Sequence, residues 1–286
     1  MTKQMAGKAE YTEKERMAGK MKFSERKQGL VTDKFKVGYG KKVILSNVNL
    51  MAEPGRVLTL IGPNGSGKST ILKSIVKQLK SLGGVVYLNG KATSEMKEAE
   101  IAKSLSMVMT EHIHPELMSC RDVVATGRYP YTGRLGILSR EDERKVDEAL
   151  EAVHAQELGI RNFQEISDGQ RQRVLLARAI CQEPEVMILD EPTSSLDDDE
   201  VEKLFVLMRR LRDEGVGIIF VTHFLEQVYA VCDRITVLRN GELVGEYETK
   251  DLPRVMLVAK MMGKDFDDLA DIKGDHKDKR ITDAEP

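Results

Sequence analysis

The chain has 286 residues, 41% of them hydrophobic, and a formal net charge of −2. This is enough apolar sequence for one large or two small packed domains, and the balanced charge excludes the global basic field of a nucleic-acid-binding protein. The three cysteines, Cys120, Cys181 and Cys232, are isolated and odd in number, which excludes a disulfide framework and a thiolate metal site. No stretch approaches the roughly 18 apolar residues of a membrane span, and the polar start is unlike a signal peptide.

The two ends of the sequence differ from its middle. Residues 1–28 are charged, weakly patterned and net positive, so we expect a disordered or partly helical extension. A basic arm near anionic lipid is the alternative for this segment. Residues 256–286 are expected to form a C-terminal helix and a polar tail, because Asp and Lys dominate from residue 264 onward. Residues 29–255 are predicted to form one domain.

Strand and helix patterns alternate within this domain. Three short apolar runs have the composition of strands buried on both faces, and helix-like sequence follows each: residues 57–61, 185–190 and 216–222. Helical patterning is expected over residues 68–80 and 141–155. The alternation predicts an α/β fold around a mainly parallel sheet. Residues 101–165 interrupt it with mostly helical sequence and are expected to be an inserted helical subdomain.

A glycine-rich turn follows the first of these strands. It matches the pattern G-x-x-x-x-G-K-[ST] and stands between a strand and a helix, as a phosphate-binding loop (P-loop) must: Gly62, Pro63, Asn64, Gly65, Ser66, Gly67, Lys68, Ser69 and Thr70. Glycines let backbone N–H groups turn toward a phosphate, and the helix N-terminus adds the positive end of its dipole. Lys68 is expected to reach the β- and γ-phosphates of ATP, and the Ser69 hydroxyl to bind Mg²⁺.

Two carboxylates follow the apolar strand that ends at residue 189. Asp190 and Glu191 are therefore expected at the C-terminal edge of a parallel sheet, beside the P-loop. Asp190 is the natural partner of a Mg²⁺ ion, and Glu191 can accept a proton from an attacking water. The alternative is a helix N-cap followed by an acidic residue, but the position after an apolar strand favours the catalytic interpretation.

The sequence at residues 166–173, Ile-Ser-Asp-Gly-Gln-Arg-Gln-Arg, resembles the signature of the ABC ATPases, usually written L-S-G-G-Q. As in that family, a helix and then the Asp-Glu strand follow it, and the resemblance covers about residues 29–250. It implies a P-loop NTPase (RecA-like) core with a mainly parallel sheet, an antiparallel β subdomain and the inserted helical subdomain. It also implies an enzyme that hydrolyses ATP to ADP and phosphate with Mg²⁺ and couples this reaction to transport.

The resemblance assigns further residues to the nucleotide. Tyr39 is expected to stack on adenine, the alternative being an ordinary strand tyrosine. His223 is expected to contact the γ-phosphate and to position the attacking water. Asp197 lies in a segment that resembles the loop crossing the dimer interface. The residues that would contact the γ-phosphate held by a second subunit are Ser167, Asp168, Gly169 and Gln170. The family therefore implies a homodimer in which neither subunit alone has a complete site.

Three positions depart from the family pattern. Asp168 stands where the signature usually has glycine, and Phe224 follows His223 where an acid is commoner. The family's metal-contacting glutamine should fall at Thr110, at the end of a strand over residues 105–109. The threonine side chain is shorter than that of glutamine, so its hydroxyl can bind Mg²⁺ only at a shorter reach. The neighbouring Glu111 offers a carboxylate instead. The nearby His112 and His114 lack a third ligand at a suitable spacing for a metal site.

Two parts of the chain resemble different branches of the family. Residues 29–182, above all 101–182, are similar to ATPases of iron-siderophore, haem and cobalamin importers. Residues 197–262 are similar to ATPases of monosaccharide importers, which usually carry two cassettes per chain. The change falls close to residues 190–197, so a recombined chain is an alternative to a natural one. Because the helical insert grips the permease in this family, we favour import of an iron-siderophore-type chelate.

The partners implied are a second ATPase subunit, an integral membrane permease and an extracytoplasmic solute-binding protein, with no nucleic acid. The expected location is the cytoplasmic face of the cell membrane, through the permease. A soluble ABC ATPase of DNA repair or translation is the competing class. Repair members carry a long coiled coil and translation members two cassettes, and neither is present in this sequence.

Overall fold

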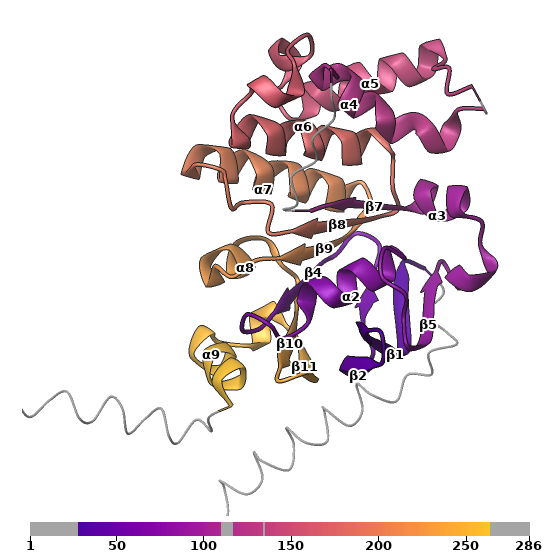
Figure 1. The fold of residues 1–286 in the computed structure, drawn as a ribbon. Coiled ribbons are helices and arrows are strands. Elements are labelled where there is room, and N and C mark those ends of the chain that lie inside the picture. Colours follow the sequence, from indigo (N-terminus) through magenta and orange to yellow (C-terminus); the bar gives the residue numbers. More distant parts are fainter. Residues whose placement is uncertain (1–27, 110–116, 134, 264–286) are drawn as a thin grey trace, which may run out of the picture.

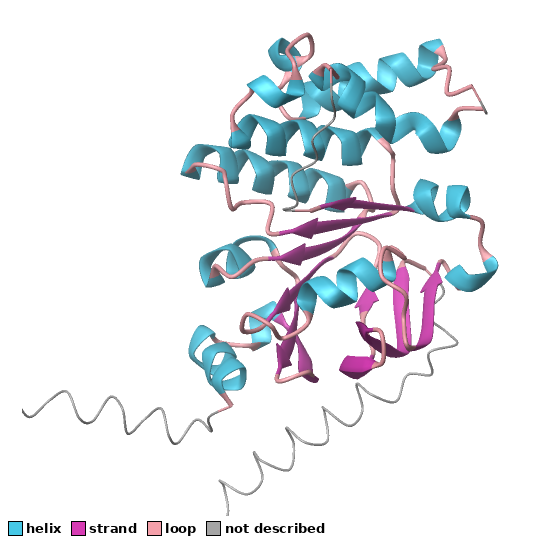
Figure 2. Ribbon diagram, viewed as in Figure 1, coloured by secondary structure: helices cyan, strands magenta, loops and turns pink. Residues whose placement is uncertain are grey.

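The computed structural model describes residues 28–109, 117–133 and 135–263. Its strands form two sheets, one of them mainly parallel and one antiparallel, with helices around them (Figures 1 and 2). This is the α/β fold that the sequence predicts. Among the described residues, no helix is both long and apolar enough to cross a lipid bilayer.

The parallel sheet has the strand order β11-β10-β4-β9-β8-β7. Its strands are β4 (Val57–Ile61), β7 (Leu105–Val108), β8 (Val186–Asp190), β9 (Gly217–Val221), β10 (Arg234–Arg239) and β11 (Glu242–Glu248). All neighbouring pairs are parallel except β10 and β11, which form an antiparallel edge. Strands β4, β8 and β9 are buried at every position, as their continuous apolar runs predict.

The second sheet is antiparallel and has the order β2-β1-β5-β6, with β3 paired to β1. Its strands are β1 (Leu30–Tyr39), β2 (Lys42–Val48), β3 (Met51–Ala52), β5 (Gly83–Leu88) and β6 (Lys91–Ala92). This sheet is the antiparallel β unit that the family resemblance implies.

The helices divide between the two faces of the parallel sheet. They are α2 (Lys68–Ile75), α3 (Glu98–Ser104), α4 (Cys120–Ala125), α5 (Arg140–Ala152), α6 (Asp168–Cys181), α7 (Asp198–Asp213), α8 (Leu225–Val231) and α9 (Arg254–Met262). The short 3₁₀ helix η3 (Thr126–Tyr131) continues from α4. Helices α4, α5 and α6 pack together as a helical layer beyond strands β7 and β8, with α7 between that layer and the sheet (Figure 1).

Helix α2 is shorter than its sequence pattern predicts. It ends at Ile75, whereas helical patterning extends to residue 80. Lys77 adopts a positive φ of 62°, and the N–H groups of Lys77 and Leu79 donate to the carbonyls of Ser74 and Lys73. These bonds close the last turn of the helix, so the chain leaves the helical path before β5.

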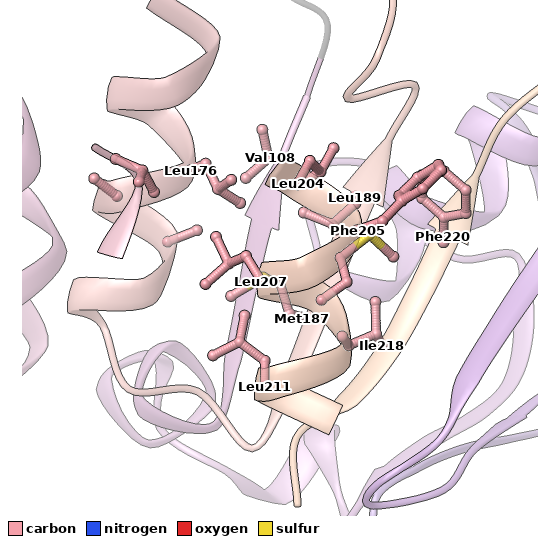
Figure 3. Packing of buried hydrophobic residues seen from close by; sticks show 14 of the residues in the cluster. Val108, Leu176, Met187, Leu189, Leu204, Phe205, Leu207, Leu211, Ile218 and Phe220 are labelled. Atoms are coloured by element: carbon pink, nitrogen blue, oxygen red, sulfur yellow. The ribbon is translucent and has the colours of Figure 1, made fainter. Parts of the chain in front are cut away.

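Alternate residues of each buried strand face different cores. Met187 and Leu189 of β8 pack with helices α4 to α8, whereas Val186 and Ile188 pack with α2 and the antiparallel sheet. Figure 3 shows the first of these cores, in which Leu204 and Phe205 of α7 lie over the strands. Helices α2 and α6 therefore lie on opposite faces of the parallel sheet. The division of the chain into domains stays a prediction.

Candidate functional site

Three neighbouring parallel strands end at one edge of the sheet. Strand β4 pairs with β9, and β9 pairs with β8. The P-loop follows β4, Asp190 ends β8 with Glu191 directly after it, and His223 follows β9. Because the carboxyl ends of parallel strands meet at one edge, these segments converge, as the sequence predicts.

The P-loop turns tightly between β4 and α2. Gly62 has no room for a side chain, because a Cβ there would lie 2.2 Å from the carbonyl oxygen of Leu238 on β10. Gly67 has a φ of 99° and caps α2, and a Cβ there would lie 1.9 Å from Leu45 Cδ1. Both positions therefore require glycine, and the chain enters α2 with the N–H groups of its first turn directed at the loop.

Lys68 is the buried cation of this loop. Its side chain is 8% exposed, and its Nζ donates hydrogen bonds to the carbonyl oxygens of Gly62 (2.8 Å) and Pro63 (3.1 Å). Burial lowers the pKa of Lys68, and the carboxylates of Glu191 and Asp190 oppose this shift. Burial removes the Lys68 ammonium from the water that would stabilise its charge, and a bound phosphate would compensate that charge instead.

Asp190 is the most deeply buried carboxylate at this edge. It is 4% exposed and accepts a hydrogen bond from the Ser69 hydroxyl. Burial and the neighbouring Glu191 raise the pKa of Asp190, while Ser69 and Lys68 act in the opposite direction. A hydroxyl and a carboxylate in contact are oxygen ligands of the kind that Mg²⁺ prefers, and the ion's charge would relieve the buried carboxylate.

The remaining metal prediction cannot be located. Thr110 lies outside the described residues, as do Glu111, His112 and His114. Within the described ranges, no group of three or more His, Cys, Asp and Glu side chains is arranged to hold a metal ion. A Mg²⁺ ion at Ser69 and Asp190 would therefore need oxygens from a nucleotide or from water.

Glu191 and His223 face each other across the ends of β8 and β9. The Oε1 atom of Glu191 lies 3.7 Å from Nδ1 of His223. Glu191 has a positive φ of 49°, uncommon for a residue other than glycine, while its N–H still donates to the carbonyl of Val221 (2.9 Å). This combination holds the backbone in the sheet ladder and turns the chain sharply after Asp190.

Gln227 on α8 is a site residue that the sequence does not reveal. Its Oε1 accepts hydrogen bonds from the hydroxyls of Thr193 (3.0 Å) and Thr222 (2.6 Å). Thr222 in turn accepts a hydrogen bond from the N–H of Phe224. Gln227 therefore joins the segment after Glu191 to the segment that carries His223. Thr222 is five residues from Gln227, but Thr193 is 34 positions away, and no spacing or motif marks that contact.

Tyr39 lies beside the start of α2. It is the last residue of β1, its ring is exposed, and its Oη lies 3.5 Å from Oγ1 of Thr70. An exposed aromatic ring next to a P-loop can stack on a flat base. The structure thus brings Tyr39 to the P-loop end of α2.

The signature residues form the start of α6. Ser167 caps this helix, accepting from the N–H of Gln170 (3.3 Å), and the Gln170 side chain accepts from the N–H of Ser167 (3.1 Å). Ser167 and Asp168 are exposed, and Asp168 pairs with Arg171 at 2.5 Å. The exposed N-terminus of a 14-residue helix favours an anionic partner.

The segment with Asp197 lies against the signature. A Cβ on Gly169 would lie 3.1 Å from the carbonyl oxygen of Ser195 and 2.9 Å from Oε2 of Glu200. Asp197 caps α7 by accepting from the N–H of Glu200 (2.8 Å). These residues are grouped together, but α6 and the P-loop helix α2 lie on opposite faces of the sheet. The structure of one subunit thus does not bring the signature to its own P-loop.

The P-loop residues fit a phosphate chain. The Ser66 hydroxyl is buried and has no hydrogen-bond partner among the described residues. It stands beside a buried ammonium, two obligatory glycines and a helix N-terminus. An anionic group with several acceptor oxygens would satisfy all of them.

Known proteins are similar in sequence to this chain. The family profile described as ABC transporter matches residues 45–194. An uncharacterized ABC transporter ATP-binding protein of Methanocaldococcus jannaschii is 43% identical, over 75% of this chain and 74% of its own length. The iron(3+)-hydroxamate import protein FhuC of Bacillus subtilis is 37% identical, over 76% of this chain and 81% of its own length. The galactofuranose transporter protein YtfR of Escherichia coli is 43% identical, over 78% of this chain but 45% of its own length.

A solved structure shares the fold. It is the dimeric, post-hydrolysis ATP-binding cassette MJ0796 bound to ADP and Pi, with a TM-score of 0.68 and 27% identity, covering 77% of this chain and 98% of that one. The predicted resemblance is thus confirmed by sequence, by fold and by the P-loop itself. The chain belongs to the ABC transporter family, as an ATP-binding subunit of the kind that couples ATP hydrolysis to transport.

Proposed function

We propose that this chain is the ATPase subunit of an ABC importer and that its hydrolytic site is the sheet edge described above. The observation that carries the proposal is the convergence of a buried P-loop lysine, a buried Asp and the Glu191–His223 pair on three adjacent strand ends. Cation, metal-binding oxygens and a proton acceptor are the groups that phosphoryl transfer to water requires.

Each group has a distinct role in this proposal. The P-loop N–H groups and Lys68 would hold the phosphates. Ser69 and Asp190 would hold Mg²⁺, whose charge would offset that of the phosphate oxygens. Glu191 takes a proton from the attacking water, and His223, 3.7 Å away, orients that water against the γ-phosphate. Thr110 or the neighbouring Glu111 completes the metal contact, and Tyr39 stacks on adenine.

The complete site requires a second copy of the chain. The signature lies on the opposite face of the sheet from its own P-loop, and the N-terminus of its helix is exposed. Residues 167–170 would therefore close over ATP held by the partner subunit, and the segment with Asp197 lies beside them at this interface. A permease, a solute-binding protein and a place on the cytoplasmic face of the membrane belong to the same proposal.

The solute we propose is an iron chelate of the siderophore type. The helical layer, expected to grip the permease, is the part of the sequence that resembles iron-chelate importers. The extent of the matches also supports it, since this chain spans 81% of the iron-hydroxamate relative and 45% of the galactofuranose relative. A monosaccharide is the second candidate, because the galactofuranose relative has the higher identity, 43% against 37%.

Uptake by the reconstituted transporter tests this function. The chain would be purified with the permease that accompanies it, and the complex placed in liposomes that contain ATP. We expect ATP-dependent uptake of radioactive ferric hydroxamate, abolished by Glu191→Gln. Uptake of a labelled monosaccharide without uptake of iron would show that the solute is a monosaccharide and not an iron chelate. Iron uptake that is equal with and without ATP would contradict the coupling.

A further inference from the structure

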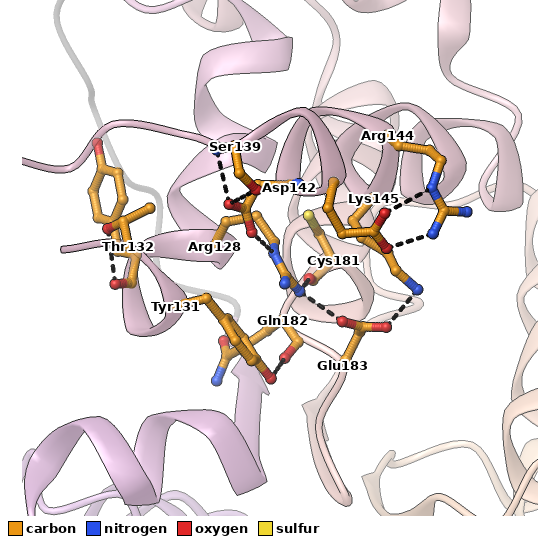
Figure 4. A network of polar contacts seen from close by, with 12 residues as sticks. Arg128, Tyr131, Thr132, Ser139, Asp142, Arg144, Lys145, Cys181, Gln182 and Glu183 are labelled. Atoms are coloured by element: carbon orange, nitrogen blue, oxygen red, sulfur yellow. Dashed lines mark hydrogen bonds and ion pairs between the residues drawn. The ribbon is translucent and has the colours of Figure 1, made fainter.

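Arg128 is a buried cation at the junction of the helical layer and the sheet (Figure 4). It lies on η3 and is 4% exposed, so its charge must be compensated within the protein. Its Nε donates to Oδ1 of Asp142 on α5 (2.9 Å), and its Nη1 donates to Oε2 of Glu183 (2.8 Å). The Glu183 carboxylate also pairs with Lys145 of α5 at 2.6 Å.

The same side chain closes the C-terminal end of the signature helix α6. The Nη1 of Arg128 donates to the carbonyl oxygen of Cys181 (2.8 Å), the last residue of that helix. The guanidinium lies 3.9 Å from the ring centre of Tyr131, whose Oη donates to the carbonyl oxygen of Gln182 (2.9 Å). Carbonyls at a helix end lack partners within the helix and carry its negative dipole end. A cation and a hydroxyl from η3 thus cap α6 from outside.

This cap lies between two segments that carry site residues. Helix α6 starts at the signature and ends at the cap, and β8 then leads from Val186 to Asp190. The Gln182 side chain also donates to the carbonyl oxygen of Leu105 (2.8 Å), at the start of β7. The cap therefore joins the helical layer to the strands at the point where the chain passes from one to the other.

We propose that Arg128 is a positioning residue for the signature, holding α6 at the angle that presents Ser167 to a partner-bound nucleotide. The proposal rests on the signature's role in the proposed composite site. Helix α6 has 14 residues and is thus about 21 Å long. A tilt of about 5° at its capped end moves the other end by about 2 Å, more than a hydrogen bond tolerates. The cap is not part of the P-loop, so the affinity of the P-loop of the same subunit for ATP should not depend on it.

The alternative is that Arg128 only stabilises the fold. The two roles differ in one measurable respect. A purely stabilising residue affects dimer formation only as far as it affects folding, whereas a positioning residue affects ATP-driven dimer formation beyond that, with ATP binding to the monomer preserved. The comparison needs variants that lose stability elsewhere.

The test uses Glu191→Gln as the parent, so that ATP is retained. Arg128→Met keeps an apolar stem and removes the cap, and Tyr131→Phe removes only the hydroxyl bonded to Gln182. Arg121→Met is the matched control, since Arg121 pairs with Asp147 between α4 and α5 without touching the end of α6. Leu257→Ala is the stability control, because Leu257 is fully buried on α9.

Three measurements are made on each variant: melting temperature, affinity for a fluorescent ATP analogue in dilute monomer, and the ATP concentration that gives half-maximal dimer. For Arg128→Met we expect monomer affinity within about twofold of the parent and a requirement for at least about tenfold more ATP to form the dimer. Tyr131→Phe should shift the dimer in the same direction by a few-fold, and it carries the test if Arg128→Met does not fold. Arg121→Met should resemble the parent.

Two outcomes would overturn the inference in different ways. If Arg128→Met and Tyr131→Phe weaken dimer formation no more than Leu257→Ala at equal loss of melting temperature, the network is structural only. Ser167→Arg is measured alongside, because it should block the dimer directly. If Ser167→Arg forms the dimer as readily as the parent, the proposed role of the signature is wrong, and the inference fails with it.

Discussion

Lys68→Ala tests whether the P-loop binds the phosphates. The ammonium is buried and held by the carbonyl oxygens of Gly62 and Pro63. If the proposed phosphate site is correct, nucleotide binding would replace these neutral carbonyl acceptors with charged phosphate oxygens. The variant removes this cation and leaves the glycine turn, the α2 N-terminus and Ser69 in place.

The expected loss follows from the contact that disappears. A hydrogen bond to a charged group is worth about 1.5–3 kcal/mol, and each 1.4 kcal/mol corresponds to a tenfold change in affinity. Lys68→Ala should therefore weaken binding of a non-hydrolysable ATP analogue by about 10- to 150-fold. Turnover should fall further, because Lys68 would also stabilise the charge that the transferring and leaving phosphates carry in the transition state.

The pH dependence of nucleotide affinity provides an independent test. Burial lowers the pKa of Lys68 below the ordinary lysine value of 10.5, and bound phosphate favours the protonated form. Affinity should therefore decrease as pH rises through the lowered pKa of the free protein. The alanine variant should lose this alkaline dependence.

Isothermal titration calorimetry with the analogue and Mg²⁺, at neutral and alkaline pH, measures both effects. Lys80→Ala is the matched control, since Lys80 is exposed just beyond α2. A dissociation constant for Lys68→Ala within about twofold of the wild-type value would show that this loop is not the phosphate site.

Two further predictions concern the metal. Asp190→Asn should raise the Mg²⁺ concentration needed for ATPase activity at least about tenfold, while the nucleotide-free protein melts no lower at pH 7. The pKa of Asp190 is raised in the folded state, so its negative charge lowers the stability of the fold above that pKa. The difference in melting temperature between Asp190→Asn and the wild type should therefore vanish in acid. An unchanged Mg²⁺ requirement would refute the assignment of Asp190 to the metal. Thr110→Gln should raise permease-stimulated turnover more than basal turnover. No change in either rate would remove Thr110 from coupling, and a large change of Mg²⁺ dependence in Glu111→Ala would give the metal contact to Glu111.

Much of the fold is predictable from local sequence. The strands at Val57–Ile61, Val186–Asp190 and Gly217–Val221 lie within a residue or so of the predicted runs, because strands buried on both faces must be apolar throughout. Helix boundaries are less predictable. Helix α6 begins at Asp168 because Ser167 caps it, so the signature forms its first turn, whereas the family resemblance places the helix after the signature.

The site is predictable where chemistry follows a motif. The P-loop, Asp190–Glu191 and His223 each lie at or just after the end of a strand, so parallel topology brings them together. Contacts between distant residues leave no such pattern. Gln227 meets Thr193 across 34 positions, and Arg128 meets Glu183 across 55. The left-handed backbone of Glu191 is also invisible in sequence, since only the surrounding sheet imposes it.

Two properties of the Glu191→Gln variant test the central claim most directly. They are its rate of ATP hydrolysis and its accumulation of an ATP-bound dimer. If Glu191 is the proton acceptor of a composite site, this variant keeps ATP binding and loses turnover by about 10²- to 10⁴-fold. It then accumulates an ATP-bound dimer that elutes early from a sizing column, and the dimer disappears when Ser167→Arg is added. Near-normal hydrolysis by Glu191→Gln, or a strictly monomeric ATP-bound protein, would contradict the account.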